Sequence, residues 1–148
     1  MVIDVYAVIV TYNPDILLLE KQLISLENQV SGIIIIDNCS NNKTEIEQSV
    51  HSKFLTLKLI LNNENRGLGY AQNFGIREAK KSGATDVILL DQDSVFNSDC
   101  VKNLIDARED LCKQNIKVGG LGPLYYNERT KEVYPISKYY GPFIKRFV

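Results

Sequence analysis

The 148-residue sequence contains no tryptophan and a single histidine, His51. A metal site built from histidines and a Ser-His-Asp triad both depend on histidine side chains, so both kinds of site are nearly excluded. The formal net charge is −1, and positive charge is correspondingly sparse. Because nucleic acid binding needs a strong positive field, we expect no nucleic acid partner.

Cysteine is also scarce, and the spacing of the cysteines matches no metal-binding or redox motif. The three residues are Cys39, Cys100 and Cys112, and the gaps of 61 and 12 match neither a zinc pattern nor C-x-x-C. Reduced thiols in a cytosolic protein are therefore expected. No apolar run approaches the roughly 20 residues that a membrane-spanning helix needs. The N-terminus lacks the basic flank and cleavage site of a signal peptide, so a cytoplasmic location is expected.

Apolar strand-like segments alternate with helix-like segments along the chain. This order predicts an α/β fold with a mostly parallel sheet flanked by helices. The expected strands are residues 5–10, 33–37, 55–61, 86–90 and 117–121. The expected helices are residues 15–29 with Asn13 as the N-cap, 44–50, 67–81, and a helix from 97 or 98 to 114.

Two of the expected helices carry informative patterns. The first has one apolar stripe, formed by Ile16, Leu19, Leu23, Leu26 and Val30. The third has small residues four apart at Ala71, Gly75 and Ala79, which predicts a face that approaches the sheet closely. The fourth helix is expected to turn Val101, Leu104, Ile105 and Leu111 inward.

Periodicity is lost in the last part of the chain. Tyrosine, proline and glycine dominate residues 125–148, and a loop, an edge hairpin and an orphaned segment all fit this composition. We therefore expect a ligand-binding core at residues 1–124 and an irregular tail at residues 125–148.

Polar and acidic residues follow four of the expected strands. In an open α/β sheet, ligands bind outside the carboxyl ends of the strands. Those ends carry Thr11-Tyr12-Asn13, Asp37-Asn38, Asn65-Arg66-Gly67 and Asp91-Gln92-Asp93. The clustering predicts one ligand site at this edge of the sheet.

Asp91 and Asp93 suit a divalent cation. Mg²⁺ and Mn²⁺ prefer oxygen ligands and are commonly held by one or two carboxylates plus substrate phosphates. Two carboxylates alone make a weak site, which the diphosphate of a nucleotide-sugar would complete. The alternative is a solvated turn that caps the following helix.

The other two polar segments suit a nucleotide. Asp37 and Asn38 could accept the imide N–H of uracil or thymine, or bind a ribose hydroxyl, although a turn cap in this loop is the alternative. Arg66 could pair with phosphate, and glycines at a helix start favour an anion near the backbone. The alternative for Gly69 and Gly75 is that they only permit tight helix–sheet packing.

These motifs together resemble family 2 glycosyltransferases of the GT-A fold. The segments that carry the resemblance are Val8-Ile9-Val10-Thr11-Tyr12-Asn13-Pro14, Ile36-Asp37-Asn38-Cys39-Ser40, the spacing Asn65-x-Gly67-x-Gly69-x-Ala71-x-Asn73-x-Gly75, Leu90-Asp91-Gln92-Asp93-Ser94 and Gly119-Gly120-Leu121-Gly122-Pro123. The D-Q-D-S spelling is similar to that of bacterial rhamnosyltransferases, which use dTDP-L-rhamnose.

The resemblance implies an inverting, metal-dependent transfer from a nucleotide-sugar donor, with Mg²⁺ or Mn²⁺ as the cofactor. The acceptor would be a saccharide or lipid-linked saccharide of a bacterial cell-surface polysaccharide or glycolipid. It implies donor-binding roles for Thr11, Tyr12, Asn13, Asp37, Asn38, Asn65, Arg66, Gly67, Asn73 and Asp91. It also implies Asp91 and Asp93 as metal ligands, with Asp93 the principal one.

The sequence departs from the family in its length. Family members usually continue through an acceptor-binding half that carries the general base, and no convincing base is found in this chain. We therefore expect a donor-binding part cut short, or a non-catalytic remnant that binds a nucleotide or a partner. Dimer formation and peripheral membrane association at the inner face, through the missing part, stay open. A dinucleotide-binding oxidoreductase is disfavoured because G-x-G-x-x-G does not follow the first strand.

Overall fold

The structure is a computed structural model, and it describes residues 4–51, 56–124, 126, 130, 132–134, 136–140 and 143–147. The chain divides into two compact units, residues 1–101 and 102–148. The expected boundary after residue 124 stays a prediction. No helix of the described residues is long and apolar enough to cross a membrane.

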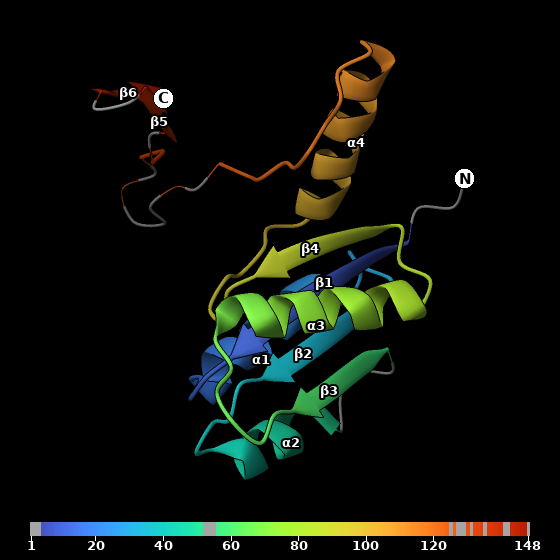
Figure 1. Ribbon diagram of the computed structural model, residues 1–148, viewed down its shortest axis with the longest axis vertical. Helices are drawn as coiled ribbons and strands as arrows, with labels where there is room; N and C mark the ends of the chain where they lie inside the picture. The colour runs from blue at the N-terminus through green and yellow to red at the C-terminus, as the bar shows by residue number, and fades with distance from the viewer. Residues whose placement is uncertain are drawn as a thin grey trace. The chain divides into compact units, whose positions relative to one another are not determined.

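The first unit is built on a four-stranded parallel sheet (Figure 1). Its strands are β1 (Val5–Thr11), β2 (Gly32–Asp37), β3 (Leu57–Leu61) and β4 (Asp86–Leu90), in the order β3-β2-β1-β4. The register pairs Thr11 with Asp37, and Asp37 with Leu61. The carboxyl ends of these strands are therefore level, and the residues that follow them meet at one edge.

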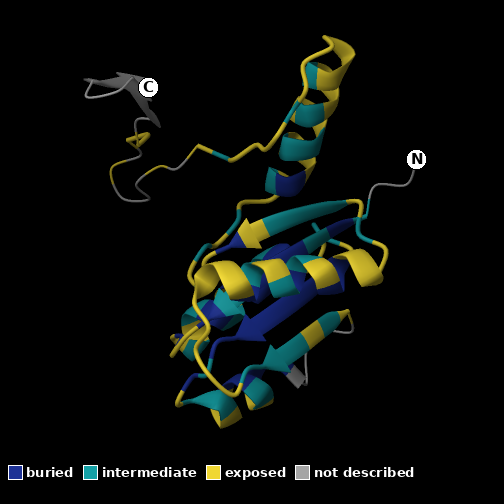
Figure 2. Ribbon diagram, viewed as in Figure 1, coloured by how far each residue is buried: buried dark blue, intermediate teal, exposed yellow. Residues whose placement is uncertain are grey.

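Helices cover both faces of this sheet. The helices α1 (Ile16–Leu26) and α2 (Lys43–His51) pack on one face, and α3 (Leu68–Lys81) packs on the other (Figure 1). The first core cluster contains Leu19, Leu23 and Leu26 of α1 against Ile33 and Ile35 of β2. β1 and β2 are the most deeply buried strands (Figure 2), which is why both are almost continuously apolar. The predicted α/β fold is thus confirmed.

The small residues of α3 lie against the sheet, as their spacing predicts. Ala71 and Ala79 are fully buried, and Gly75 lies over Val8. A Cβ atom on Gly75 would overlap Val8 Cγ1 and would lie 3.3 Å from Val8 Cγ2. The helix ends at the expected place, where Gly83 has a φ of 96°. Glycine tolerates this left-handed conformation without steric cost.

The expected N-cap of α1 is wrong by two residues. Asp15, not Asn13, caps the helix, and its Oδ1 accepts a hydrogen bond from the Leu18 N–H at 3.0 Å. Asp15 has the extended backbone that an N-cap needs, whereas Asn13 has a φ of 48°. Proline at position 14 is therefore outside the helix rather than in its first turn.

The helix α4 (Cys100–Lys113) is amphipathic but shallowly buried. Val101 is buried as expected, while Leu104, Ile105 and Leu111 are only half-buried. The strand expected at residues 117–121 is wrong, because these residues form no strand. Three glycines, at positions 119, 120 and 122, weaken strand formation by their backbone freedom.

The tail contains a hairpin, which is one of the three alternatives that its composition allowed. β5 (Ile136–Tyr140) pairs antiparallel with β6 (Phe143–Phe147), and Ile136 lies opposite Phe147. An isolated antiparallel bridge joins Tyr126 to Val133.

The ion pairs of Glu78 predict an acid-sensitive contribution to stability. Its two carboxylate oxygens contact Lys58 Nζ and Lys81 Nζ, each at 2.6 Å. Hydrogen bonds from these lysines lower the pKa of Glu78 from 4.5 to about 2. Because the pKa is lowered on folding, the contribution is full above pH 4.5 and is lost as the pH falls toward about 2.

We therefore expect Glu78→Gln to be less stable than the wild type near neutral pH. The difference between their unfolding free energies should shrink as the pH falls from 4.5 to about 2. Urea unfolding at several pH values measures this difference. A difference that stays constant through that range would show that the carboxylate charge contributes nothing.

Candidate functional site

A cavity of about 440 Å³ opens at the carboxyl edge of the parallel sheet. Volumes of roughly 300–1,000 Å³ are usual for small-molecule sites. Its walls come from the ends of β1, β2 and β4 and from the start of α3, and the lining residues are Val10, Tyr12, Asn38, Asn65, Leu68, Asp91, Gln92 and Asp93. The structure therefore brings together residues of all four polar segments at the edge where the sequence places a ligand.

The turn that carries Asp91 and Asp93 is held from two sides. The Tyr12 N–H donates to Gln92 Oε1 at 2.8 Å, and Gln22 Nε2 donates to the Asp91 carbonyl oxygen at 2.6 Å. Both aspartates are exposed and line the cavity. The turn thus presents two carboxylates to the cavity while the Gln92 side chain ties it to the residue after β1 and the Asp91 carbonyl ties it to α1.

The acidic turn fits a divalent cation that a ligand helps to hold. Carboxylate oxygens are the ligands that Mg²⁺ and Mn²⁺ prefer. In the described parts of the chain, no group of three or more histidine, cysteine or acidic side chains could enclose a metal ion. Two carboxylates leave coordination positions open, and phosphate oxygens are the kind of ligand that could fill them.

Asp37 stabilises the loop after β2 and does not line the cavity. It is fully buried, and its Oδ1 accepts hydrogen bonds from Thr11 Oγ1 at 3.0 Å and from Ser40 Oγ. Its Oδ2 accepts the Ser40 N–H at 2.9 Å. This geometry is that of the turn cap, which was the alternative for this position. The predicted direct contacts of Asp37 and Thr11 with a nucleotide stay predictions.

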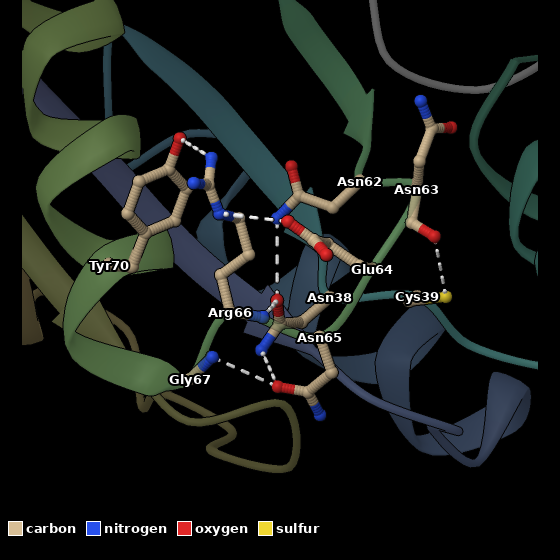
Figure 3. Close-up of polar contacts among 9 residues, drawn as sticks. All are labelled: Asn38, Cys39, Asn62, Asn63, Glu64, Asn65, Arg66, Gly67 and Tyr70. Carbon is tan, nitrogen blue, oxygen red and sulfur yellow. Dashed lines mark hydrogen bonds and ion pairs between the residues drawn. The ribbon is translucent and has the colours of Figure 1, made fainter.

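Asn38 connects the end of β2 to the start of α3 (Figure 3). Its Oδ1 accepts the Arg66 N–H at 3.1 Å and Asn62 Nδ2 at 3.3 Å. Its Nδ2 donates to Asn65 Oδ1 at 2.7 Å, and that oxygen also accepts the Gly67 N–H at 3.0 Å. Asn38 and Asn65 both line the cavity, so this network fixes two amides at the site.

Arg66 lies beside this network with its guanidinium directed to Tyr70 (Figure 3). Its Nη1 donates to Tyr70 Oη at 2.6 Å, its Cζ lies 4.1 Å from the centre of that ring, and its Nε lies 3.3 Å from Glu64 Oε1. The side chain is exposed and is not among the lining residues. Its predicted pairing with phosphate stays a prediction.

Three other predicted binding residues lie outside the lining. One is Gly67, whose binding role stays a prediction, and the other two are Asn13 and Asn73. The Asn13 N–H donates to Ser40 Oγ and its Oδ1 accepts the Asn41 N–H, each at 2.8 Å, so Asn13 ties the loop after β1 to the loop after β2. Asn73 is exposed on α3, on the side away from the buried Ala71 and Gly75. Binding roles for both residues stay predictions.

Sequence reasoning missed several residues that build the site. Val10, Leu68 and Gln92 line the cavity, and Gln22 is a fully buried polar residue that supports the acidic turn. A signal for Gln22 is present in the sequence. It lies between Leu19 and Leu23 in the buried half of α1, where a polar side chain needs a partner.

The chain is similar to a curated protein in sequence and to solved structures in fold. The chain is 32% identical over 137 residues to the "dTDP-rhamnosyl transferase RfbF" of Shigella flexneri, which covers 90% of this chain and 42% of that protein. Among solved structures, S. aureus TarS 1–349 matches with a TM-score of 0.53 and 21% identity, over 82% of this chain and 38% of that one. Its complex with UDP-GlcNAc matches with a TM-score of 0.56 and 22% identity, over 82% and 37%.

These matches agree with the architecture. The chain spans less than half the length of each of these relatives. The structural matches show the fold alone, a GT-A-like α/β arrangement of a parallel sheet between helices. The family described as "Glycosyl transferase family 2" matches residues 6–146, which is nearly the whole chain. This chain therefore belongs to glycosyl transferase family 2.

Proposed function

We propose that this chain is the donor-binding part of a glycosyltransferase that uses dTDP-L-rhamnose. The proposed acceptor is a saccharide or lipid-linked saccharide of the bacterial cell surface. The observation that carries the proposal is the cavity at the carboxyl edge of the sheet, which exposed carboxylates and fixed amides line together. The similarity to a dTDP-rhamnosyl transferase supports this donor rather than another.

The pyrimidine would lie near Tyr12, Asn38 and Asn65. Tyr12 lines the cavity with a side chain that is 51% exposed, so its ring is available to stack on a base. Asn65 directs its amide nitrogen away from the Asn38 network (Figure 3), which leaves a donor for a base carbonyl. In this proposal Asp37 and Thr11 are positioning residues, because their polar atoms are occupied by one another and by Ser40.

The diphosphate would lie near Asp91 and Asp93. These carboxylates would hold Mg²⁺ or Mn²⁺, and such an ion neutralises the negative charge that develops on a departing nucleoside diphosphate. The chain's own contribution is to keep the turn in place. Gln92 anchors it to Tyr12, and Gln22 anchors it to α1.

We propose transfer with inversion, in which an acceptor hydroxyl attacks the anomeric carbon as the bond to the diphosphate breaks. A carboxylate base would take the hydroxyl proton, and we assign no residue of this chain to that role. Two acidic residues of α4, Asp106 and Asp110, are paired with Lys102 and Lys113 at 2.6 and 2.9 Å. A cytoplasmic location, a dimer and peripheral membrane association stay predictions.

The first test is ligand-induced stabilisation. With Mn²⁺ or Mg²⁺ and dTDP at one hundred times Kd, we expect about 2.7 kcal/mol of stabilisation. For a chain of this size that corresponds to about 5–10 °C in Tm. A thermal melt with dTDP, UDP and metal, singly and together, measures it, and a larger shift with dTDP than with UDP would support the rhamnosyl donor.

Asp93→Asn is the matched variant for this test. Asp93 is exposed, so the ligand-free Tm should stay near that of the wild type, while the metal-dependent part of the shift should be lost. If no nucleoside diphosphate shifts the wild-type Tm with either metal, the donor-binding proposal is wrong. A non-catalytic interaction module would then be the better interpretation of the same fold.

A further inference from the structure

Three polar side chains of α1 form a row that faces the segment between β4 and α4. They are Gln22, Ser25 and Gln29, spaced by 3 and 4 residues, so they lie on one side of the helix and its C-terminal turn. We call them the α1 polar row. The adjacent stripe of Leu19, Leu23 and Leu26 is buried in the core. The row therefore sits at the border of the core, where helix side chains can bond a neighbouring backbone.

The first two members bond the backbone at and after the acidic turn. Gln22 Nε2 donates to the Asp91 carbonyl oxygen at 2.6 Å. Ser25 Oγ accepts the Phe96 N–H at 3.1 Å and donates to the Gln22 carbonyl oxygen at 2.7 Å. Because Ser25 bonds both the helix and the segment, it links the segment to a rigid element.

Gln29 completes the row at the far end of the segment. Its Nε2 donates to the Ser25 carbonyl oxygen at 2.7 Å and to the Asn97 carbonyl oxygen at 2.9 Å. Its Oε1 accepts the Val101 N–H at 3.2 Å, at the first turn of α4. The three side chains thus bond the backbone at four points between residues 91 and 101.

Outside the α1 polar row, the segment is also held by the bond from the Tyr12 N–H to Gln92 Oε1. Residues 91–99 form no strand or helix, and Asp91, Asp93 and Val95 are exposed. Phe96 is only partly buried against the core. A loop with few apolar contacts depends on its hydrogen bonds for a defined position. The positions of the two carboxylates therefore depend on the α1 polar row together with the bond between Gln92 and Tyr12.

We propose that the α1 polar row positions Asp91 and Asp93 to hold a divalent ion together with a nucleoside diphosphate. Gln22, Ser25 and Gln29 are positioning residues, because they act through the backbone and touch no ligand in this scheme. The inference rests on the proposed donor-binding function and adds the part of the fold that sets its metal affinity. Groups that orient metal ligands commonly change metal affinity by about 10- to 100-fold when they are removed.

Gln22 offers a variant that separates positioning from folding. Its Oε1 is buried and has no hydrogen-bond partner among the described residues. Methionine has a similar size, and it removes this unpartnered acceptor together with the bond to Asp91. Losing the bond to Asp91 lowers the free energy of unfolding, and removing the unpartnered oxygen raises it. Because these two effects offset each other, Gln22→Met should have a Tm close to that of the wild type. Lys21→Met is the matched control, because Lys21 is the exposed neighbour on the same helix.

The experiment measures the Kd of Mn²⁺ by calorimetric titration of the full chain with saturating dTDP. We expect Gln22→Met to raise this Kd about tenfold, and Lys21→Met to leave it unchanged. Ser25→Ala should raise it as well, while Ser25→Thr, which keeps a hydroxyl, should restore it. Amide exchange in the ligand-free chain should become faster at Phe96 in Ser25→Ala and at Val101 in Gln29→Met.

The outcomes distinguish this inference from the proposed function. If the wild type binds Mn²⁺ with dTDP and Gln22→Met binds it equally well, the positioning role is wrong and the function stands. If affinity falls only in step with the melting temperature, the row is structural and the inference is also wrong. A wild type that binds no Mn²⁺ with dTDP overturns the function and this inference with it.

Discussion

Gly75→Ala should lower the free energy of unfolding by about 3 kcal/mol, which is a large share of the stability of a single domain. A methyl group at this position would overlap Val8 Cγ1 and would lie 3.4 Å from Ile36 Cγ1. Both neighbours belong to the buried central strands, so neither can move away without disturbing the sheet. The helix must therefore shift outward and lose contact with the second core cluster.

Gly69→Ala is the matched control, because it makes the same change in the same helix with the opposite expected sign. A Cβ atom at Gly69 would meet nothing within 4 Å. Alanine has a better helix propensity than glycine, so this variant should gain about 0.5–1 kcal/mol. Urea unfolding of both variants measures the two effects. A gain at both positions would show that backbone propensity, and not the approach to the sheet, governs both.

The fold of the first unit could largely be predicted because its pattern is simple. The apolar runs of β1, β2 and β4 are bounded by polar turns, and the spacing of Leu19, Leu23 and Leu26 predicts the buried face of α1. The strand expected at residues 117–121 failed because apolar residues there are separated by glycines, and local composition does not show whether a partner strand is present. Pairing partners are a tertiary property that a sequence pattern does not contain.

The sequence predicted where the site lies, but it did not predict which residues line the cavity and which ones support them. Strand ends placed Tyr12, Asn38, Asn65, Asp91 and Asp93 at one edge, and all of them line the cavity. Which of two adjacent polar residues faces a cavity depends on backbone direction at the strand end. Asp37 turns into the loop and Asn38 reaches the cavity, and the sequence D-N alone does not distinguish these two orientations.

Asp37→Ala should destabilise the chain by about 4 kcal/mol, because it removes the acceptor of three hydrogen bonds at a fully buried position. The hydroxyls of Thr11 and Ser40 can rotate to find other partners, but the Ser40 N–H cannot. Asp37→Asn should cost about half as much, since one acceptor oxygen remains. Urea unfolding measures the series, and Asp93→Ala in the exposed turn after β4 should show almost no loss.

The affinity of the chain for dTDP tests whether Asp37 also contacts the nucleotide. No atom of Asp37 lines the cavity, so Asp37→Asn that is kept folded should bind dTDP with Mn²⁺ almost as tightly as the wild type. Asn38→Ala should bind it more weakly, because Asn38 lines the cavity and holds Asn65 in place. Equal losses in the two variants would show that the aspartate meets the nucleotide directly. The contrast follows from burial: Asp37 is fully buried and uses both carboxylate oxygens to orient the loop, whereas Asn38 lines the cavity itself.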